Sequence, residues 1–255
     1  MSSRLVVLGS CGAWPEPGRA CSGFVLEHDG FRVVMDLGYG TVSRLLDVVG
    51  SRTGAGIDAV VVTHKHPDHM VDLHGLFRAR WFGDRDAEPL PLYAPDGVVQ
   101  RLQGLEEDDE EAIQRIFNWH ELAADQPYAL GPWLLRSWWL PHFVPNAGVR
   151  LTAEGLTVAY TGDTGPDPHL CDSPTMRICS SPRPAIVGRA AMRHRQGREP
   201  GCTSQPTMPV PQPRPRARGG YSSPTSGRAM IARLRKERQP RSLTVRFSLP
   251  TRGSG

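Results

Sequence analysis

The stretch "IDAVVVTHKHPDHM", residues 57–70, decides the fold of this chain. It begins with a continuous apolar run, which is typical of a strand buried on both faces, and the run ends abruptly at Thr63. Imidazole nitrogens and carboxylate oxygens are ligands that zinc, manganese and iron accept, and a turn after a strand can direct alternate side chains to one point. A polar loop with histidines by chance does not need so many donors so close together, so the stretch predicts a metal site. The candidate ligands are His64, His66, Asp68 and His69.

The residues around this motif indicate an α/β fold. Asp29-Gly30 separates two runs of alternating apolar and polar residues, and this dipeptide favours a tight hairpin turn because it tolerates positive φ. The second run ends at Asp36, and a helical pattern follows. Strands are expected at 5–8, 24–28, 31–36, 57–62, 90–93, 134–140, 149–151 and 156–160, and helices are expected at 42–49 and 106–116.

Four stretches besides the histidine motif carry a resemblance to a known family. They are LGSCGAWP (8–15), ACSGFVLEHDGFRVVMDLGYG (20–40), HFVPNAGVRL (142–151) and AYTGDTG (159–165). Together with THKHPDH, and in this order, they resemble the metallo-β-lactamase superfamily, and more narrowly its ribonuclease Z-like and cyclic-phosphodiesterase-like branch. The resemblance covers about residues 4–170 and implies a four-layer αββα sandwich.

The resemblance also implies a site for two zinc ions, with manganese or iron as alternatives. His64, His66 and His142 would hold one ion, Asp68 and His69 would hold the second, and Asp163 would bridge the two. Paired ions of this kind lower the pKa of a shared water and stabilise charge on an oxyanion.

Two aspartates have expected roles of their own in that site. Asp68 would orient or deprotonate the attacking water, which makes it the candidate catalytic residue. Asp36 would support the site through hydrogen bonds. Of the other histidines in this part, His28 is expected on the surface, and His120 is expected in packing or on the surface. His74 is expected on the surface of a helix, with support of the metal ligands as the alternative.

The charge of the chain changes sign near residue 171. Residues 1–171 hold 13 Lys and Arg and 23 Asp and Glu (13 − 23 = −10), whereas residues 172–255 hold 17 and 3 (17 − 3 = +14). The second part also lacks tryptophan and carries 12 of the 24 prolines, so it is not expected to bury a core. We therefore expect a truncated metallo-β-lactamase-like domain over 1–171, with its sandwich incomplete at the C-terminal end, and a disordered Arg/Pro/Ser-rich tail over 172–255.

A shift of the reading frame explains this change of composition. The branch pattern continues after TGDT with an acidic "EA" step, an "HLT" segment and a final "LTH" whose histidine completes the second metal site, and the chain has none of these. Read from the third base of each codon, residues 172–183 can encode LADDADLFIAEA, 201–209 can encode VHLTADDAG and 220–227 can encode LLLTHLWP. All three motifs occur in one frame and in the expected order. Sequencing the DNA across codons 165–175 tests the hypothesis.

Two classes of function follow. The first is a metal-dependent hydrolase that acts on a small-molecule or RNA phosphodiester, impaired by the missing ligand; an ester, lactone, thioester or β-lactam substrate is an alternative. The second is a non-catalytic remnant that binds one metal ion.

The tail has the charge of a nucleic-acid-binding arm but only two aromatic residues, so we do not expect it to bind nucleic acid. No apolar run is long enough for a membrane span, which favours a cytoplasmic protein. A homodimer is one alternative for the oligomeric state.

Overall fold

The fold is described from a computed structural model of the chain, which covers residues 3–106, 110–165, 167, 185–187 and 243–247. Most of the expected disordered tail, 172–255, lies outside the described residues, as do the three segments to which the frameshift hypothesis refers. The two described segments of that region are short strands, and the division of the chain at residue 171 stays a prediction.

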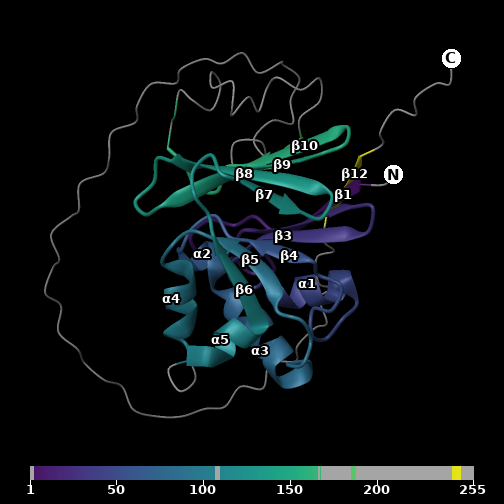
Figure 1. The fold of residues 1–255 in the computed structure, drawn as a ribbon, viewed down its shortest axis with the longest axis vertical. Coiled ribbons are helices and arrows are strands. Elements are labelled where there is room, and N and C mark those ends of the chain that lie inside the picture. Colours follow the sequence, from purple (N-terminus) through teal and green to yellow (C-terminus); the bar gives the residue numbers. More distant parts are fainter. Residues whose placement is uncertain (1–2, 107–109, 166, 168–184, 188–242, 248–255) are drawn as a thin grey trace, which may run out of the picture. The chain divides into compact units, whose positions relative to one another are not determined.

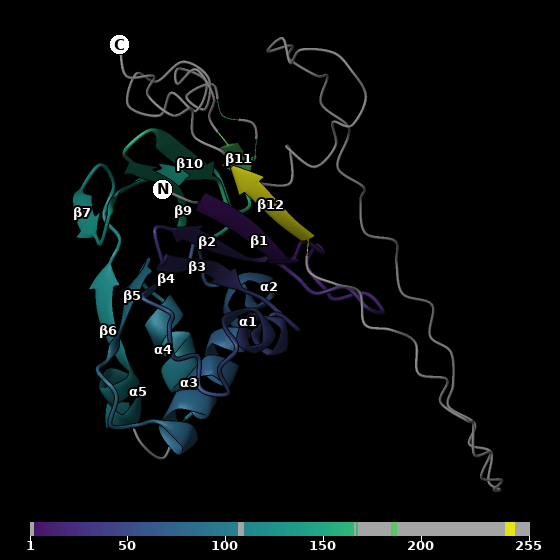
Figure 2. The same cartoon turned by 90° about the vertical axis from the view of Figure 1, so that its right-hand side faces the viewer.

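Two sheets form the framework (Figure 1). In order across the first sheet, the strands are β12 (Leu243–Phe247), β1 (Ser3–Gly9), β2 (Gly23–His28), β3 (Phe31–Leu37), β4 (Ala59–Val61), β5 (Leu90–Ala94) and β6 (Phe117–Glu121). In order across the second, they are β11 (Ala185–Val187), β10 (Leu156–Tyr160), β9 (Asn146–Ala153), β8 (Trp133–Leu140) and β7 (Pro127–Leu130). Figure 2 shows β12 beside β1 and β11 at the edge of the second sheet.

Helices cover one face of the first sheet, and the second sheet covers the other (Figure 1). Alternation along β3 explains the layering: Val34 packs in the core shared with the helices, whereas Val33 and Met35 pack in the core between the sheets. All helices of the described residues contribute side chains to the core that they share with the first sheet. None of these helices is long and apolar enough to cross a membrane. They are α1 (Val42–Val49), α2 (Pro67–Met70), α3 (Asp72–Gly83), α4 (Val98–Gln103) and α5 (Glu110–Ile116).

Most of the expected elements are present, and the differences are local. The hairpin turns at Asp29 and Gly30, both with positive φ, as the dipeptide predicts. The expected helix at 106–116 is described only from Glu110 to Ile116. His28 was expected on the surface, which is wrong: its ring is buried between Trp133 and the hydroxyl of Ser3, whose Oγ lies 2.6 Å from Nδ1.

Glu27 on β2 ties the neighbouring strands together and gives a prediction for stability. It accepts hydrogen bonds from Arg4 on β1 and Arg32 on β3, at 2.8 and 2.9 Å. Burial raises the pKa of this carboxyl, but the two guanidinium groups outweigh burial and lower it. Because the pKa of Glu27 is lowered in the folded protein, its carboxylate stabilises the fold at pH values above the ordinary pKa of glutamate. This stabilisation is lost as the pH falls.

We therefore expect Glu27→Gln to destabilise the fold by about 1 kcal/mol at pH 7, and by less at pH 3. Urea unfolding at the two pH values measures the difference, and an effect that does not depend on pH would contradict the assignment.

Candidate metal centre

The candidate site lies where strands of both sheets end. Strands β3, β4, β5 and β6 are parallel, so their carboxyl ends lie at one edge of the first sheet. Asp36 lies near the end of β3, and Thr63 and His64 follow β4. The second sheet joins at the same place, because the N–H of Ala147 on β9 donates to the carbonyl of Thr63 at 2.8 Å.

The first group of donors is His64, His66 and His142, which the sequence predicted as one set. His142 Nε2 lies 2.9 Å from His66 Nδ1, and the ring of His64 lies 4.8 Å from each of the other two rings. Each residue offers one ligand atom, and the three ligand atoms lie within 4.8 Å of one another. His142 follows β8, so this group joins the two sheets.

The second group is His64, His69 and Asp163, and it differs from the expected set in two respects. His69 Nε2 lies 3.4 Å from Asp163 Oδ1 and 3.6 Å from Asp68 Oδ2, so the expected ligands lie together. However, His64 belongs to both groups, whereas the resemblance implied it for the first ion alone. Asp68, which the resemblance implied for the second ion, is not a member of the second group. The structure thus brings all six candidate ligands to one place.

The unpaired nitrogens of this cluster fit a metal ion. Nε2 of His64 and Nε2 of His69 are buried and make no hydrogen bond of normal geometry, although Nε2 of His69 lies 3.4 Å from the carboxylate of Asp163. Each such atom destabilises a fold by about 1–3 kcal/mol unless something satisfies it. The donor set of imidazoles and carboxylates suits zinc, manganese or iron, so the residues present are chemically matched to the expected ions.

The shifted pKa values of His64 and His69 also fit a metal ion at this cluster. Burial and the nearby His69 lower the pKa of His64 to about 3, so one ring nitrogen stays unprotonated and available as a ligand. Burial would also lower the pKa of His69, but the carboxylates of Asp36 and Asp163 outweigh it and raise the pKa to about 10. The carboxylates around His69 therefore favour a cation at this point, and a metal ion there would compete with the proton.

Asp36 is the centre of the hydrogen bonds behind the ligands. It is fully buried, has a positive φ of 57° and accepts bonds from the N–H and the hydroxyl of Thr63, at 2.8 and 2.9 Å. Its Oδ2 also accepts from Nδ1–H of His69 and from the hydroxyl of Tyr160, both at 2.6 Å. The hydroxyl of Thr63 lies 3.0 Å from Nδ1 of His64. Asp36 thus orients His69 directly and His64 through Thr63, which confirms its expected supporting role.

Tyr160 is a part of this network that the sequence reasoning missed. It is buried at the end of β10, and burial together with the charge of Asp36 raises its pKa well above the ordinary value, so it stays a hydroxyl donor. Alternation along β10 gives the signal that could have identified it. Tyr160 lies on the same face as Val158, which packs between the sheets, and it comes directly before TGDT.

Comparisons with known proteins agree with this geometry. Residues 32–177, more than half of the chain, match the family described as "Beta-lactamase superfamily domain". A ribonuclease Z of Thermoplasma acidophilum is 30% identical over 153 residues, which are 60% of this chain and 49% of that protein. A ribonuclease Z of Haloferax volcanii is 37% identical over 105 residues, 41% of this chain and 32% of that protein. The chain covers less than two thirds of the length of either relative.

Solved structures show the same fold. The metallo-β-lactamase fold protein YhfI of Bacillus subtilis superposes with a TM-score of 0.55 at 27% identity, over 64% of this chain and 63% of that one. The short form of human tRNase Z gives a TM-score of 0.53 at 24% identity, over 65% and 71%. The chain therefore belongs to the metallo-β-lactamase superfamily, and within it the chain is ribonuclease Z-like.

Proposed function

We propose that this chain is a metal-dependent phosphodiester hydrolase whose activity is impaired. The observation that carries the proposal is the pair of overlapping donor groups, which share His64 and are built around buried imidazole nitrogens without partners. The relatives named ribonuclease Z and the fold shared with human tRNase Z support a phosphodiester, in RNA or in a small molecule, as the bond to be cleaved.

Each residue of the site has a defined task in this proposal. His64, His66 and His142 would hold one metal ion, and His69, Asp163 and Asp68 would hold a second. Ions held there supply a Lewis acid that lowers the pKa of water and stabilises negative charge on phosphoryl oxygens. Asp68 is buried beside His69 and is the group that accepts the proton of the attacking water. Asp36 and Tyr160 keep the ring of His69 in place.

The impairment concerns the second ion. The resemblance calls for one more histidine after Asp163, and the chain offers only His169 and His194, both outside the described residues. The family match ends at residue 177, within a few residues of the change in composition, which supports the frameshift hypothesis. Loss of a direct ligand weakens a site by more than the ~10–100-fold that is typical for residues behind the ligands.

A metal titration combined with an activity assay tests the proposal. We expect one tightly bound zinc per chain, and slow hydrolysis of bis(p-nitrophenyl) phosphate that requires added zinc or manganese. Asp68→Asn should lower the remaining rate by about 100-fold or more, since general bases contribute ~10²–10⁴-fold. Asp47→Asn, an exposed aspartate on α1, is the matched control and should have no effect.

The outcomes separate the alternatives. Two tightly bound ions and fast turnover would refute the impairment, whereas one ion with no turnover under any metal would favour the non-catalytic remnant. If the protein hydrolyses a lactone or a thioester but not the phosphodiester, its substrate belongs to another class of ester. A cytoplasmic location and a homodimer stay predictions from the sequence.

A further inference from the structure

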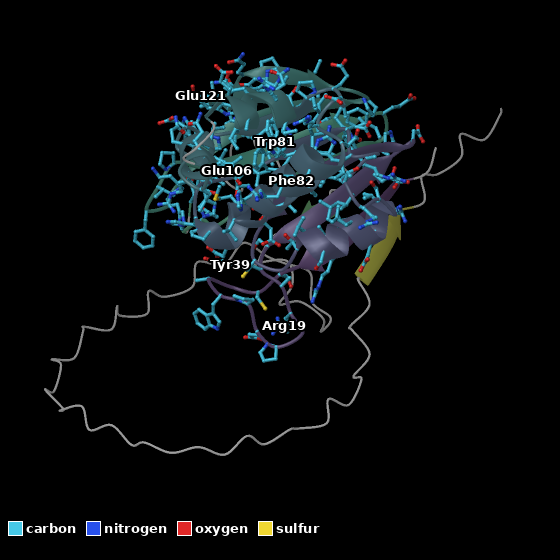
Figure 3. The ribbon with its side chains drawn as sticks, turned by 90° about the horizontal axis from the view of Figure 1, so that it is seen from below. Arg19, Tyr39, Trp81, Phe82, Glu106 and Glu121 are labelled. Atoms are coloured by element: carbon cyan, nitrogen blue, oxygen red, sulfur yellow. The ribbon has the colours of Figure 1, made fainter. Side chains whose placement is uncertain are left out.

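The outer face of the second sheet, which is turned away from the first sheet, carries two arginines opposite each other. Arg136 on β8 and Arg150 on β9 are direct partners across the antiparallel pair, so their side chains lie on the same face. Their chain neighbours Leu135 and Leu151 pack in the core between the sheets, so alternation directs both arginines outward. The described helices pack on the first sheet, and Figure 3 views that helical layer, with Trp81 of α3, from the side opposite the second sheet.

The charge of Arg150 is not balanced by a carboxylate of the described residues. Like charges that lie directly opposite each other across two strands repel. Arg136 forms an ion pair with Asp125 at 3.6 Å, but Arg150 has no ion pair within the described part of the chain. Burial, and then the charge of Arg136, lower the pKa of Arg150. A partly buried guanidinium with a second one opposite it favours a negative group nearby.

Trp138 adds a hydrogen-bond donor without a partner beside Arg150. The guanidinium carbon of Arg150 lies 5.1 Å from the centre of the Trp138 ring, a contact that holds the cation against the indole. Nε1 of Trp138 is buried and has no hydrogen-bond partner. Both residues line a hollow of about 10 Å³, together with residues of β9 and β10. A hollow of this size holds about one water-sized group.

We infer that Arg150, Arg136 and Trp138 form a site for an oxyanion, such as a carboxylate, phosphate or sulfate group, with one of its oxygens in the hollow. The indole N–H and the guanidinium groups can only donate hydrogen bonds, so the group between them must accept. A cation would be repelled, and a water molecule would leave the charge of Arg150 unbalanced. None of the three residues belongs to a donor group of the metal centre, so the inference does not rest on the proposed function.

Nuclear magnetic resonance of the indole N–H groups tests the inference at a single residue. The chain has six tryptophans, and Trp138→Phe identifies the signal of Trp138. Sulfate, added to the ¹⁵N-labelled full chain at constant ionic strength, should move this signal until it saturates. Two other signals are internal controls. Nε1 of Trp119 donates to the carbonyl of Ala94 at 3.2 Å, and Trp133 is buried in the core between the sheets, so neither signal should move.

Arginine variants show whether the two guanidinium groups hold the anion. Arg150→Gln should weaken sulfate binding by about 10- to 150-fold, the factor that corresponds to one hydrogen bond to a charged group. Arg136→Gln should weaken it less, because Arg136 also pairs with Asp125. Arg101→Gln, an exposed arginine on α4, is the matched control and should leave the affinity unchanged. Arg150→Gln removes a contact between like charges, so it should keep the fold, which circular dichroism checks.

A second titration, with hexaglutamate, distinguishes the source of the oxyanion. A shift of the Trp138 signal at lower concentrations of hexaglutamate than of sulfate would support the site and assign it to an acidic segment of a protein. The reverse order would support the site and assign it to a free oxyanion.

Three results would overturn the inference. The first is the absence of a saturable shift of the Trp138 signal with both probes. The second is an equal shift of all indole signals, which indicates a general effect of salt. The third is an unchanged affinity for sulfate in Arg150→Gln.

Discussion

Replacing His64 with alanine is expected to remove the one tightly bound zinc ion of the chain. His64 is the one residue that belongs to both donor groups, and it is fully buried, so no other described side chain can take its place without a shift of the backbone. Loss of a direct ligand should reduce zinc affinity by well over the ~100-fold that marks the upper range for residues behind the ligands. Elemental analysis after gel filtration should find almost no zinc on this variant.

A matched histidine and a stability measurement sharpen this test. His120 on β6 stacks on Tyr93 and belongs to neither donor group, so His120→Ala should keep its zinc. The metal-free His64→Ala protein should be less stable than the unchanged protein, because the substitution leaves a cavity at a fully buried position and removes the contact with Thr63. Zinc should raise the unfolding temperature of the unchanged protein and leave that of His64→Ala unaltered. Normal zinc content in the variant would contradict the shared role of His64.

Replacing Asp36 with alanine should destabilise the metal-free protein by about 3–5 kcal/mol, a large part of the stability of a typical domain. The substitution leaves the donors of Thr63, His69 and Tyr160 buried without their acceptor. It also places alanine at a left-handed φ of 57°, a region that aspartate and asparagine adopt more readily than alanine does. Urea unfolding at pH 7 in the presence of a chelator measures the change.

Two asparagine variants separate the backbone effect from the hydrogen bonds. Asparagine tolerates the left-handed region as aspartate does, so Asp36→Asn keeps the backbone and removes the charge. We expect it to be destabilised by less than Asp36→Ala and to bind zinc more weakly than the unchanged protein. Asp125 has nearly the same φ, 60°, but is exposed, and Asp125→Asn should change stability by no more than about 0.5 kcal/mol. An equal loss of stability in Asp36→Asn and Asp125→Asn would contradict the role of Asp36 as the acceptor of these hydrogen bonds.

Features encoded within a few neighbouring residues could be predicted from the sequence. The hairpin at Asp29-Gly30 is an example, because a positive φ at two successive residues is a local requirement. The buried strand before His64 is another, because a continuous apolar run indicates burial on both faces wherever the strand lies. The proposed ligands also lie together in the structure, since four of the six come from one stretch of six residues, 64–69.

Other features depend on residues far apart in the chain. The bond from Tyr160 to Asp36 spans 124 positions and forms only when the second sheet packs on the first. His28 precedes a surface turn, yet it is buried because Trp133 of the other sheet covers it. Periodicity gives the face of a strand, but it does not say which residues of another sheet will lie opposite that face.

By itself, the sequence determined the family, the two-sheet α/β framework and the six candidate ligands, because these depend on local patterns and on motifs in a fixed order. The tertiary structure alone decided that His64 is shared by both donor groups and that Asp36 accepts the hydrogen bonds behind them. The physical reason is that burial and donor–acceptor geometry are properties of packed surfaces, and here those surfaces come from segments separated by more than 70 residues.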